Sequence, residues 1–107
     1  MAQRKIDLMI HESVSRYVRT LQQANIPLWR LYLFGSCARG TNDDDSDIDL
    51  AVFLDRDAID SFEVDLYLMR LRWDVDLRIE PHSFSRGDFE KPDPFVREIL
   101  TTGQRIV

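Results

Sequence analysis

Hydrophobic residues near the N-terminus recur every three or four positions, which is the spacing of one face of a helix. They predict a helix over residues 5–23 whose apolar stripe is formed by Ile6, Met9, Ile10, Val14, Tyr17, Val18 and Leu21. Pro27 marks its end, because proline continues a helix poorly. The apolar run over residues 31–34 then predicts a strand that is buried on both faces.

The middle of the chain predicts a turn, a short helix and a second strand. Gly35 and Ser36 form the turn, residues 36–39 open the short helix, and residues 41–46 form a polar loop. The second strand covers residues 47–54, and a helix follows from residue 58 or 61 to residue 72.

Apolar and polar residues alternate over residues 75–79, which predicts a third strand that ends before Pro81. Residues 82–93 are expected to form a polar loop. Pro94 opens a last short helix over residues 94–100, with Gly103 beyond its end and a strand or tail over residues 104–107.

This order of elements predicts one domain over residues 1–107 with an α/β (α+β) fold. We expect a small two-layer core in which helices pack on a mixed sheet of at least three strands. The sequence does not decide which strands pair in parallel.

Composition narrows the classes of function. The net charge is −5, from 14 basic and 19 acidic residues, which argues against a general nucleic-acid binder. Cys37 is the single cysteine, so no intrachain disulfide can form. We find no apolar run of about 18 residues and no signal-peptide core, so we expect a cytoplasmic protein with no membrane partner.

Gly35 and Ser36 follow a strand and open a helix. Glycine lets a ligand approach the main chain, and a serine hydroxyl at a helix start caps the helix or donates to a phosphate. Arg39 lies one helical turn later, and two interpretations stay open: a ligand of the same phosphate, or a solvent-facing or ion-paired arginine. Alone the pattern is weak, since an ordinary helix cap has the same residues.

Asp47 and Asp49 strengthen the interpretation. These residues are two positions apart on a predicted strand, so their side chains point to the same face. Paired carboxylates are suitable ligands for Mg²⁺. The neighbouring Asp43, Asp44 and Asp45 are interpreted as a solvated loop.

Asp76 is the expected third carboxylate, because it stands alone between apolar residues of the predicted third strand. Three carboxylates can hold two metal ions about 3.5–4 Å apart, with Asp76 acting as ligand or base. Two alternatives stay open: Asp74, on the same strand face, is a rival, and Asp76 could instead be a half-exposed strand residue paired with Arg78. His11 and His82 have no partner at metal-ligand spacing and are interpreted as structural or exposed.

The run from Gly35 to Gly40, followed by residues 46–50 (SDIDL), resembles the nucleotidyltransferase superfamily that includes DNA polymerase beta. It looks most like the minimal nucleotidyltransferases of bacteria and archaea. The resemblance is strong over residues 33–54, fair over 75–79 and weak elsewhere. It implies transfer of AMP from ATP to an acceptor hydroxyl: Ser36 would hold the triphosphate, Asp47 and Asp49 would bind Mg²⁺, and Asp76 would complete the site.

The same resemblance implies a partner. Minimal nucleotidyltransferases are often paired with a small helical toxin of the HEPN class, and as its antitoxin they can adenylylate a toxin tyrosine. The acidic net charge would suit a basic partner of this kind. Two alternatives stay open: a non-catalytic antitoxin that neutralises its partner by contact, and an adenylyltransferase of small molecules. Homo-oligomerisation is also left open.

Overall fold

Four strands form one mixed sheet in the order β3-β2-β1-β4. The computed structural model describes the backbone of residues 2–107 and the side chains of residues 8–107. β1 (Leu28–Phe34) pairs antiparallel with both β2 (Ile48–Leu54) and β4 (Gln104–Arg105). β2 pairs in parallel with β3 (Ile79–Ser85). None of the described helices is long and apolar enough to cross a membrane.

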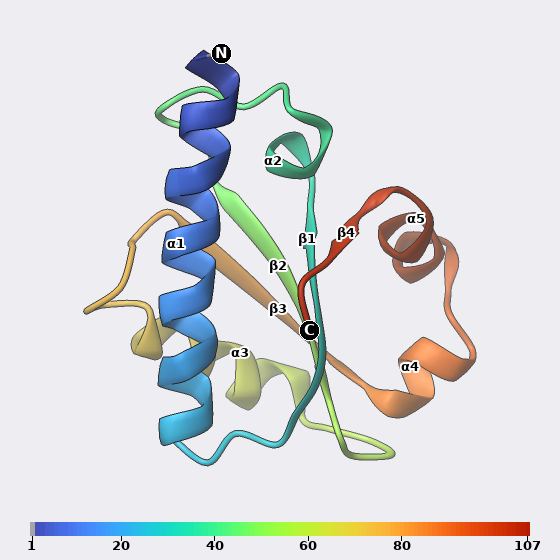
Figure 1. Ribbon diagram of the computed structural model, residues 1–107. Helices are drawn as coiled ribbons and strands as arrows, with labels where there is room; N and C mark the ends of the chain where they lie inside the picture. The colour runs from blue at the N-terminus through green and yellow to red at the C-terminus, as the bar shows by residue number, and fades with distance from the viewer. Residues whose placement is uncertain (1) are drawn as a thin grey trace.

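Helices cover both faces of this sheet (Figure 1). α1 (Ala2–Gln23) and α3 (Ser61–Leu71) lie on one face, and α4 (Arg86–Glu90) and α5 (Pro94–Thr102) lie on the other. α2 (Ser36–Arg39) follows the end of β1. The expected α+β class is confirmed, and the two C-terminal helices add a smaller third layer to the two that we expected.

The larger core lies between the sheet and α1 with α3. Alternate residues of β2 enter it, as do four residues of the α1 stripe: Ile10, Val14, Tyr17 and Leu21. The Tyr17 hydroxyl donates a hydrogen bond to the Leu68 carbonyl oxygen of α3 at 2.7 Å. The predicted stripe is thus confirmed at these four positions, but Met9 is 57% exposed, and the side chain of Ile6 lies outside the described residues.

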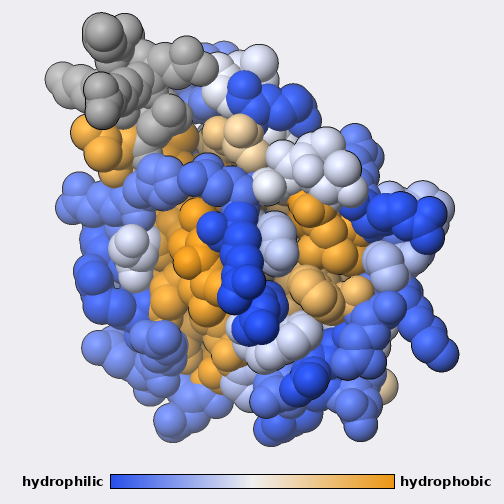
Figure 2. Space-filling view, turned by 45° about the vertical axis from the view of Figure 1, so that its right-hand side comes forward, coloured by the Kyte–Doolittle hydropathy of each residue, from blue (hydrophilic) through white to orange (hydrophobic). Residues whose placement is uncertain are grey.

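The other residues of β2 face α4 and α5. Ala51 and Phe53 form a smaller core with Val96 and Ile99 of α5. Figure 2 turns this side forward and shows hydrophobic residues gathered in the middle of the face, divided by a strip of hydrophilic side chains. By the alternation of a strand, Asp49 belongs to this second face, at the start of β2 and beside the end of β1, where α2 begins.

The third strand was predicted at the wrong place. Residues 72–75 form turns in which the Val75 and Asp76 amides donate to the Arg72 carbonyl oxygen, and β3 begins only at Ile79. The expected loop over residues 82–93 is also wrong, because β3 continues to Ser85 and α4 follows directly.

The error comes from Pro81. The sequence predicts that a strand ends before this proline. β3 is an edge strand, however, and proline is tolerated in an edge strand if its nitrogen faces away from the sheet. The Ser83 amide points outward and donates to Asp65 Oδ1 at 2.8 Å. Pro81, two residues earlier, faces the same way, so its missing N–H removes no hydrogen bond of the sheet.

The last helix, α5, begins where the sequence predicts it. Pro94 is in its first turn, Asp93 accepts a hydrogen bond from the Val96 amide at 2.8 Å, and Gly103 follows its end. β4 then pairs with Tyr32 and Leu33 of β1 and completes the sheet.

Candidate active site

Gly35 joins β1 to α2 in a backbone conformation that other residues avoid, with φ 74° and ψ −153°. A Cβ placed on Gly35 would lie 2.5 Å from Oδ2 of Asp49. Glycine is therefore required here for two reasons: the backbone angles, and the close approach of the Asp49 carboxylate.

Ser36 is the first residue of α2, and its carbonyl oxygen accepts hydrogen bonds from the Gly40 and Thr41 amides. The N-cap position belongs to Gly35, so the Ser36 side chain does not cap the helix as an ordinary serine would. The Ser36 side chain is half-buried. Arg39 is exposed at the other end of α2.

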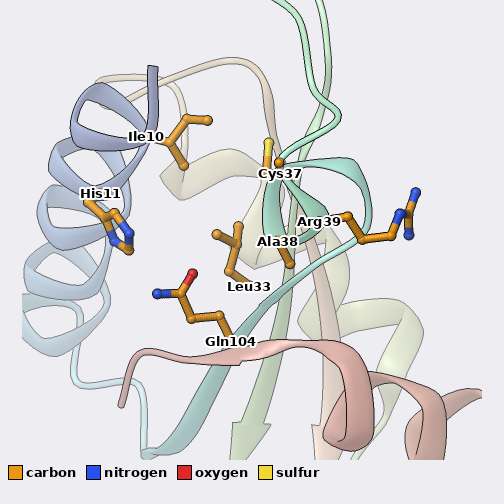
Figure 3. Close-up of a pocket in the computed structure, with 8 residues that line it drawn as sticks. Ile10, His11, Leu33, Cys37, Ala38, Arg39 and Gln104 are labelled. Atoms are coloured by element: carbon orange, nitrogen blue, oxygen red, sulfur yellow. The ribbon is translucent and has the colours of Figure 1, made fainter. Parts of the chain in front are cut away.

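Two hollows of about 220 Å³ each lie on either side of α2. The first lies toward α1 and is bordered by His11, Cys37 and Gln104, and the Arg39 side chain extends away from it (Figure 3). The second lies toward α5 and is lined by Phe34, Gly35 and Arg39 together with α5 residues that include Glu98. Since Gly35 touches Asp49, the second hollow is the one next to the carboxylates.

Three acidic residues, Asp47, Asp49 and Glu80, lie at this end of the sheet. Asp47 directly precedes β2. Asp49, within β2, pairs in register with Phe34 of β1 on one side and with Glu80 of β3 on the other. Paired residues of neighbouring strands share a face of the sheet, so Glu80 lies on the Asp49 face. Burial raises the pKa of Asp49, the neighbouring His82 opposes this rise, and the charges of Asp47 and Glu80 add to it.

Asp76 does not take the place that we expected. Its two carboxylate oxygens accept hydrogen bonds from the Arg78 guanidinium at 2.8 and 3.1 Å, and Oδ2 also accepts one from the Ser13 hydroxyl of α1 at 2.9 Å. Because α1 covers the face opposite Asp49, this carboxylate serves the packing of α1. Hydrogen bonds from Arg78 lower the pKa of Asp76 to about 2. Asp74, the rival, is exposed.

Glu80 is the acidic residue that sequence reasoning missed. Its Oε1 lies 3.3 Å from Arg72 Nη1, so the carboxylate is turned toward the outer edge of β3. Within the described side chains, no three His, Cys, Asp or Glu residues are close enough to hold a metal ion as they stand. Carboxylate oxygens are nevertheless the donors that Mg²⁺ prefers, and Asp47, Asp49 and Glu80 supply them at one end of the sheet.

His82, which the sequence suggests is structural or exposed, lies beside Asp49. It follows Glu80 by two positions on the same face of β3, and its Nε2 lies 3.8 Å from Asp49 Oδ1. Its ring also meets Phe34, with centroids 5.4 Å apart. A strand shifted to residues 79–85 would have revealed both residues, because Glu80, His82 and Phe84 alternate with the buried Ile79, Pro81 and Ser83.

A family model described as "Polymerase beta, Nucleotidyltransferase" matches residues 18–107. No curated protein matches the chain.

Two solved structures share the fold. A candidate nucleotidyltransferase from Sulfolobus solfataricus has a TM-score of 0.56 at 20% identity, over 83% of this chain and 75% of that chain. A mutant of the toxin–antitoxin complex MntA–HpeT has a TM-score of 0.60 at 21% identity, over 87% of this chain and 70% of that chain. Since the family model covers most of the chain and includes the whole site, the protein belongs to the polymerase beta nucleotidyltransferase family.

Proposed function

We propose that this protein is a metal-dependent nucleotidyltransferase that transfers AMP from ATP to a tyrosine hydroxyl of a partner protein. The observation that carries the proposal is the position of Asp49 against Gly35, with Asp47 and Glu80 at the same end of the sheet, in a chain of the nucleotidyltransferase family. Glu80 takes the role that the sequence assigned to Asp76.

The residues around the Gly35–Ser36 turn have different roles in the proposed reaction. Asp47, Asp49 and Glu80 bind divalent cations, and their oxygen donors favour two Mg²⁺ ions. When bound, such ions neutralise the triphosphate and polarise the acceptor hydroxyl. Ser36 donates its hydroxyl to the triphosphate, and the Arg39 guanidinium binds the same phosphates. The hollow between α2 and α5 is the space into which the nucleotide fits.

The reaction is a displacement at the α-phosphorus. The acceptor oxygen forms a bond to that phosphorus, the bond to the oxygen that bridges to the β-phosphorus breaks, and pyrophosphate leaves. Glu80 accepts the proton of the hydroxyl, which requires it to be ionised and turned toward Asp49.

Three observations support a protein as the acceptor. The chain has little surface beyond the nucleotide site with which to enclose a second substrate. α3 and the turn after it expose large apolar side chains: Phe62 (73%), Leu66 (50%), Tyr67 (42%) and Trp73 (69%). Exposed apolar groups of this size often mark contacts between proteins. One fold neighbour comes from a toxin–antitoxin complex, so we propose that the partner is a small helical toxin of the HEPN type and that this protein is its antitoxin.

The test uses the protein encoded beside this chain's reading frame. The two proteins are incubated with Mg²⁺ and ATP labelled at the α-phosphate, and the partner is then examined by mass spectrometry. We expect an AMP-sized mass gain on a partner tyrosine, which EDTA prevents and which the double variant Asp47→Asn, Asp49→Asn does not produce.

Absence of any mass gain with the wild-type protein would contradict the proposal. Neutralisation of the partner by the double variant would instead support an antitoxin that acts by contact. Parallel reactions with labelled GTP and CTP decide the nucleotide preference.

A further inference from the structure

We propose that His82 is a positioning residue that holds the Asp49 carboxylate in place for metal binding. This inference rests on the proposed metal-dependent function, and nothing in the Gly-Ser or Asp-x-Asp pattern points to His82.

The Asp49 carboxylate is enclosed from two sides. Its Oδ2 lies against Gly35, at the place where any other residue would have a Cβ, and its Oδ1 faces Nε2 of His82 at 3.8 Å. The side chain of Asp49 is 29% exposed and that of His82 is 42% exposed, so the pair borders solvent without being open on all sides. Rotation of the carboxylate is therefore limited by backbone on one side and by the imidazole on the other.

The imidazole itself is held by its neighbours. His82 pairs in register with Ala51 of β2, and the small Ala51 side chain lets the rings of His82 and Phe34 meet above the sheet at 5.4 Å. Phe34 in turn packs edge-to-face on Phe95 of α5, with centroids 5.8 Å apart. The ring nitrogen that faces Asp49 is thus directed by packing that reaches across three strands to α5.

This arrangement has a defined benefit for a metal ligand. The separation of 3.8 Å is within ion-pair distance but longer than a hydrogen bond, so the imidazole has to turn toward Asp49 before it can donate to the carboxylate. Partners that hydrogen-bond to a ligating carboxylate fix its orientation, and their loss typically weakens metal affinity by about 10–100-fold.

Mn²⁺ binding to the full chain, measured by calorimetry without nucleotide, tests the role directly. We expect His82→Phe, which keeps a ring against Phe34 but has no N–H, to weaken Mn²⁺ binding by about 10-fold. His82→Gln keeps a side-chain N–H and is expected to recover part of the loss. His11→Phe is the matched control, because the chain has two histidines and His11 lies on the α1 side of the sheet.

The outcomes separate the inference from the proposed function. If His82→Phe binds Mn²⁺ as the wild type does while Asp49→Asn loses binding, His82 has no positioning role and the metal site stands. If the wild type itself binds no Mn²⁺, or Asp49→Asn binds it unchanged, both proposals fail.

A second measurement does not depend on any variant being folded. In the wild-type protein, substoichiometric Mn²⁺ should broaden the NMR signals of the His82 ring protons well before those of His11. Equal broadening of the two histidines would overturn the inference.

Discussion

Oδ2 of Asp49 lies 2.5 Å from the point that a Cβ of Gly35 would occupy. The glycine of the Gly-Ser turn therefore makes room for a carboxylate of its own chain as well as for a ligand. This contact links the two halves of the motif, the end of β1 and the start of β2, through a single steric requirement.

Gly35→Ala should damage both stability and metal binding. The backbone region of Gly35 is nearly restricted to glycine, so we expect a loss of about 1–3 kcal/mol in the free energy of unfolding, measured with urea. The added methyl group should also displace Asp49 and weaken Mn²⁺ binding, measured by calorimetry. Gly40→Ala is the matched control: Gly40 is also at positive φ (73°), so stability should fall by about 1–2 kcal/mol while Mn²⁺ affinity is kept. Equal Mn²⁺ affinity in Gly35→Ala and wild type would contradict the steric link.

Glu80→Gln and Asp76→Asn distinguish the two candidates for the third carboxylate. Glu80 pairs in register with Asp49, whereas Asp76 binds Arg78 and Ser13. We expect Glu80→Gln to reduce nucleotidyl transfer by at least about 100-fold, the usual range for loss of an acid–base group. Asp76→Asn should retain transfer and lose stability. Transfer that survives in Glu80→Gln and disappears in a folded Asp76→Asn variant would restore the assignment made from the sequence.

The contribution of Asp76 to stability should depend on pH. Hydrogen bonds from Arg78 lower its folded-state pKa from 3.8 to about 2, so the stabilisation is present above the unfolded-state pKa and is lost as pH falls through the folded-state value. The Arg78 side chain is 35% exposed, which weakens the pair through solvent screening. We expect wild type to exceed Asp76→Asn by about 1–2 kcal/mol near neutral pH and by little near pH 2, in urea unfolding at a series of pH values.

The exposed neighbour Asp74 provides the control for this series. Asp74→Asn should differ little from wild type throughout. A difference between wild type and Asp76→Asn that stays constant from neutral pH to pH 2 would show that the Arg78 pair is not its source.

Tyr17→Phe should destabilise the contact between α1 and α3. The buried Tyr17 hydroxyl donates to the Leu68 carbonyl oxygen at 2.7 Å, and burial raises the pKa of Tyr17, so the hydroxyl remains a donor. Loss of this bond leaves a carbonyl oxygen with one partner fewer and should cost about 1 kcal/mol in urea unfolding. Tyr67→Phe, at a tyrosine of α3 that is 42% exposed, should cost less. Equal losses would mean that the buried hydrogen bond contributes nothing beyond the aromatic ring.

Local signals in the sequence were sufficient for most of the elements. The three- and four-residue spacing from Ile10 to Leu21 predicts the buried face of α1, and Asp93 with Pro94 marks the start of α5. The Gly35–Ser36 turn and the Asp47–Asp49 pair could be read because each lies within one short segment. Such signals are local, since periodicity and capping involve residues a few positions apart.

The third carboxylate and His82 depend on a relationship between distant segments. Glu80 stands beside Asp49 because β2 and β3 pair in parallel with Ile48 opposite Ile79, and the sequence does not encode that register in either strand alone. Asp76 and Glu80 both have apolar neighbours in the sequence. Hydrophobic periodicity is therefore compatible with a strand through either residue.

The sequence by itself determined the class of fold and the Gly35–Ser36 turn. It also singled out Asp47 and Asp49, two of the three carboxylates of the proposed site. Tertiary structure decided where the third strand lies. Pro81 is compatible with a strand only at the edge of the sheet and only when its nitrogen faces away from β2. With the strand at Ile79–Ser85 instead of residues 75–79, Glu80 rather than Asp76 stands beside Asp49, and His82 lies against it.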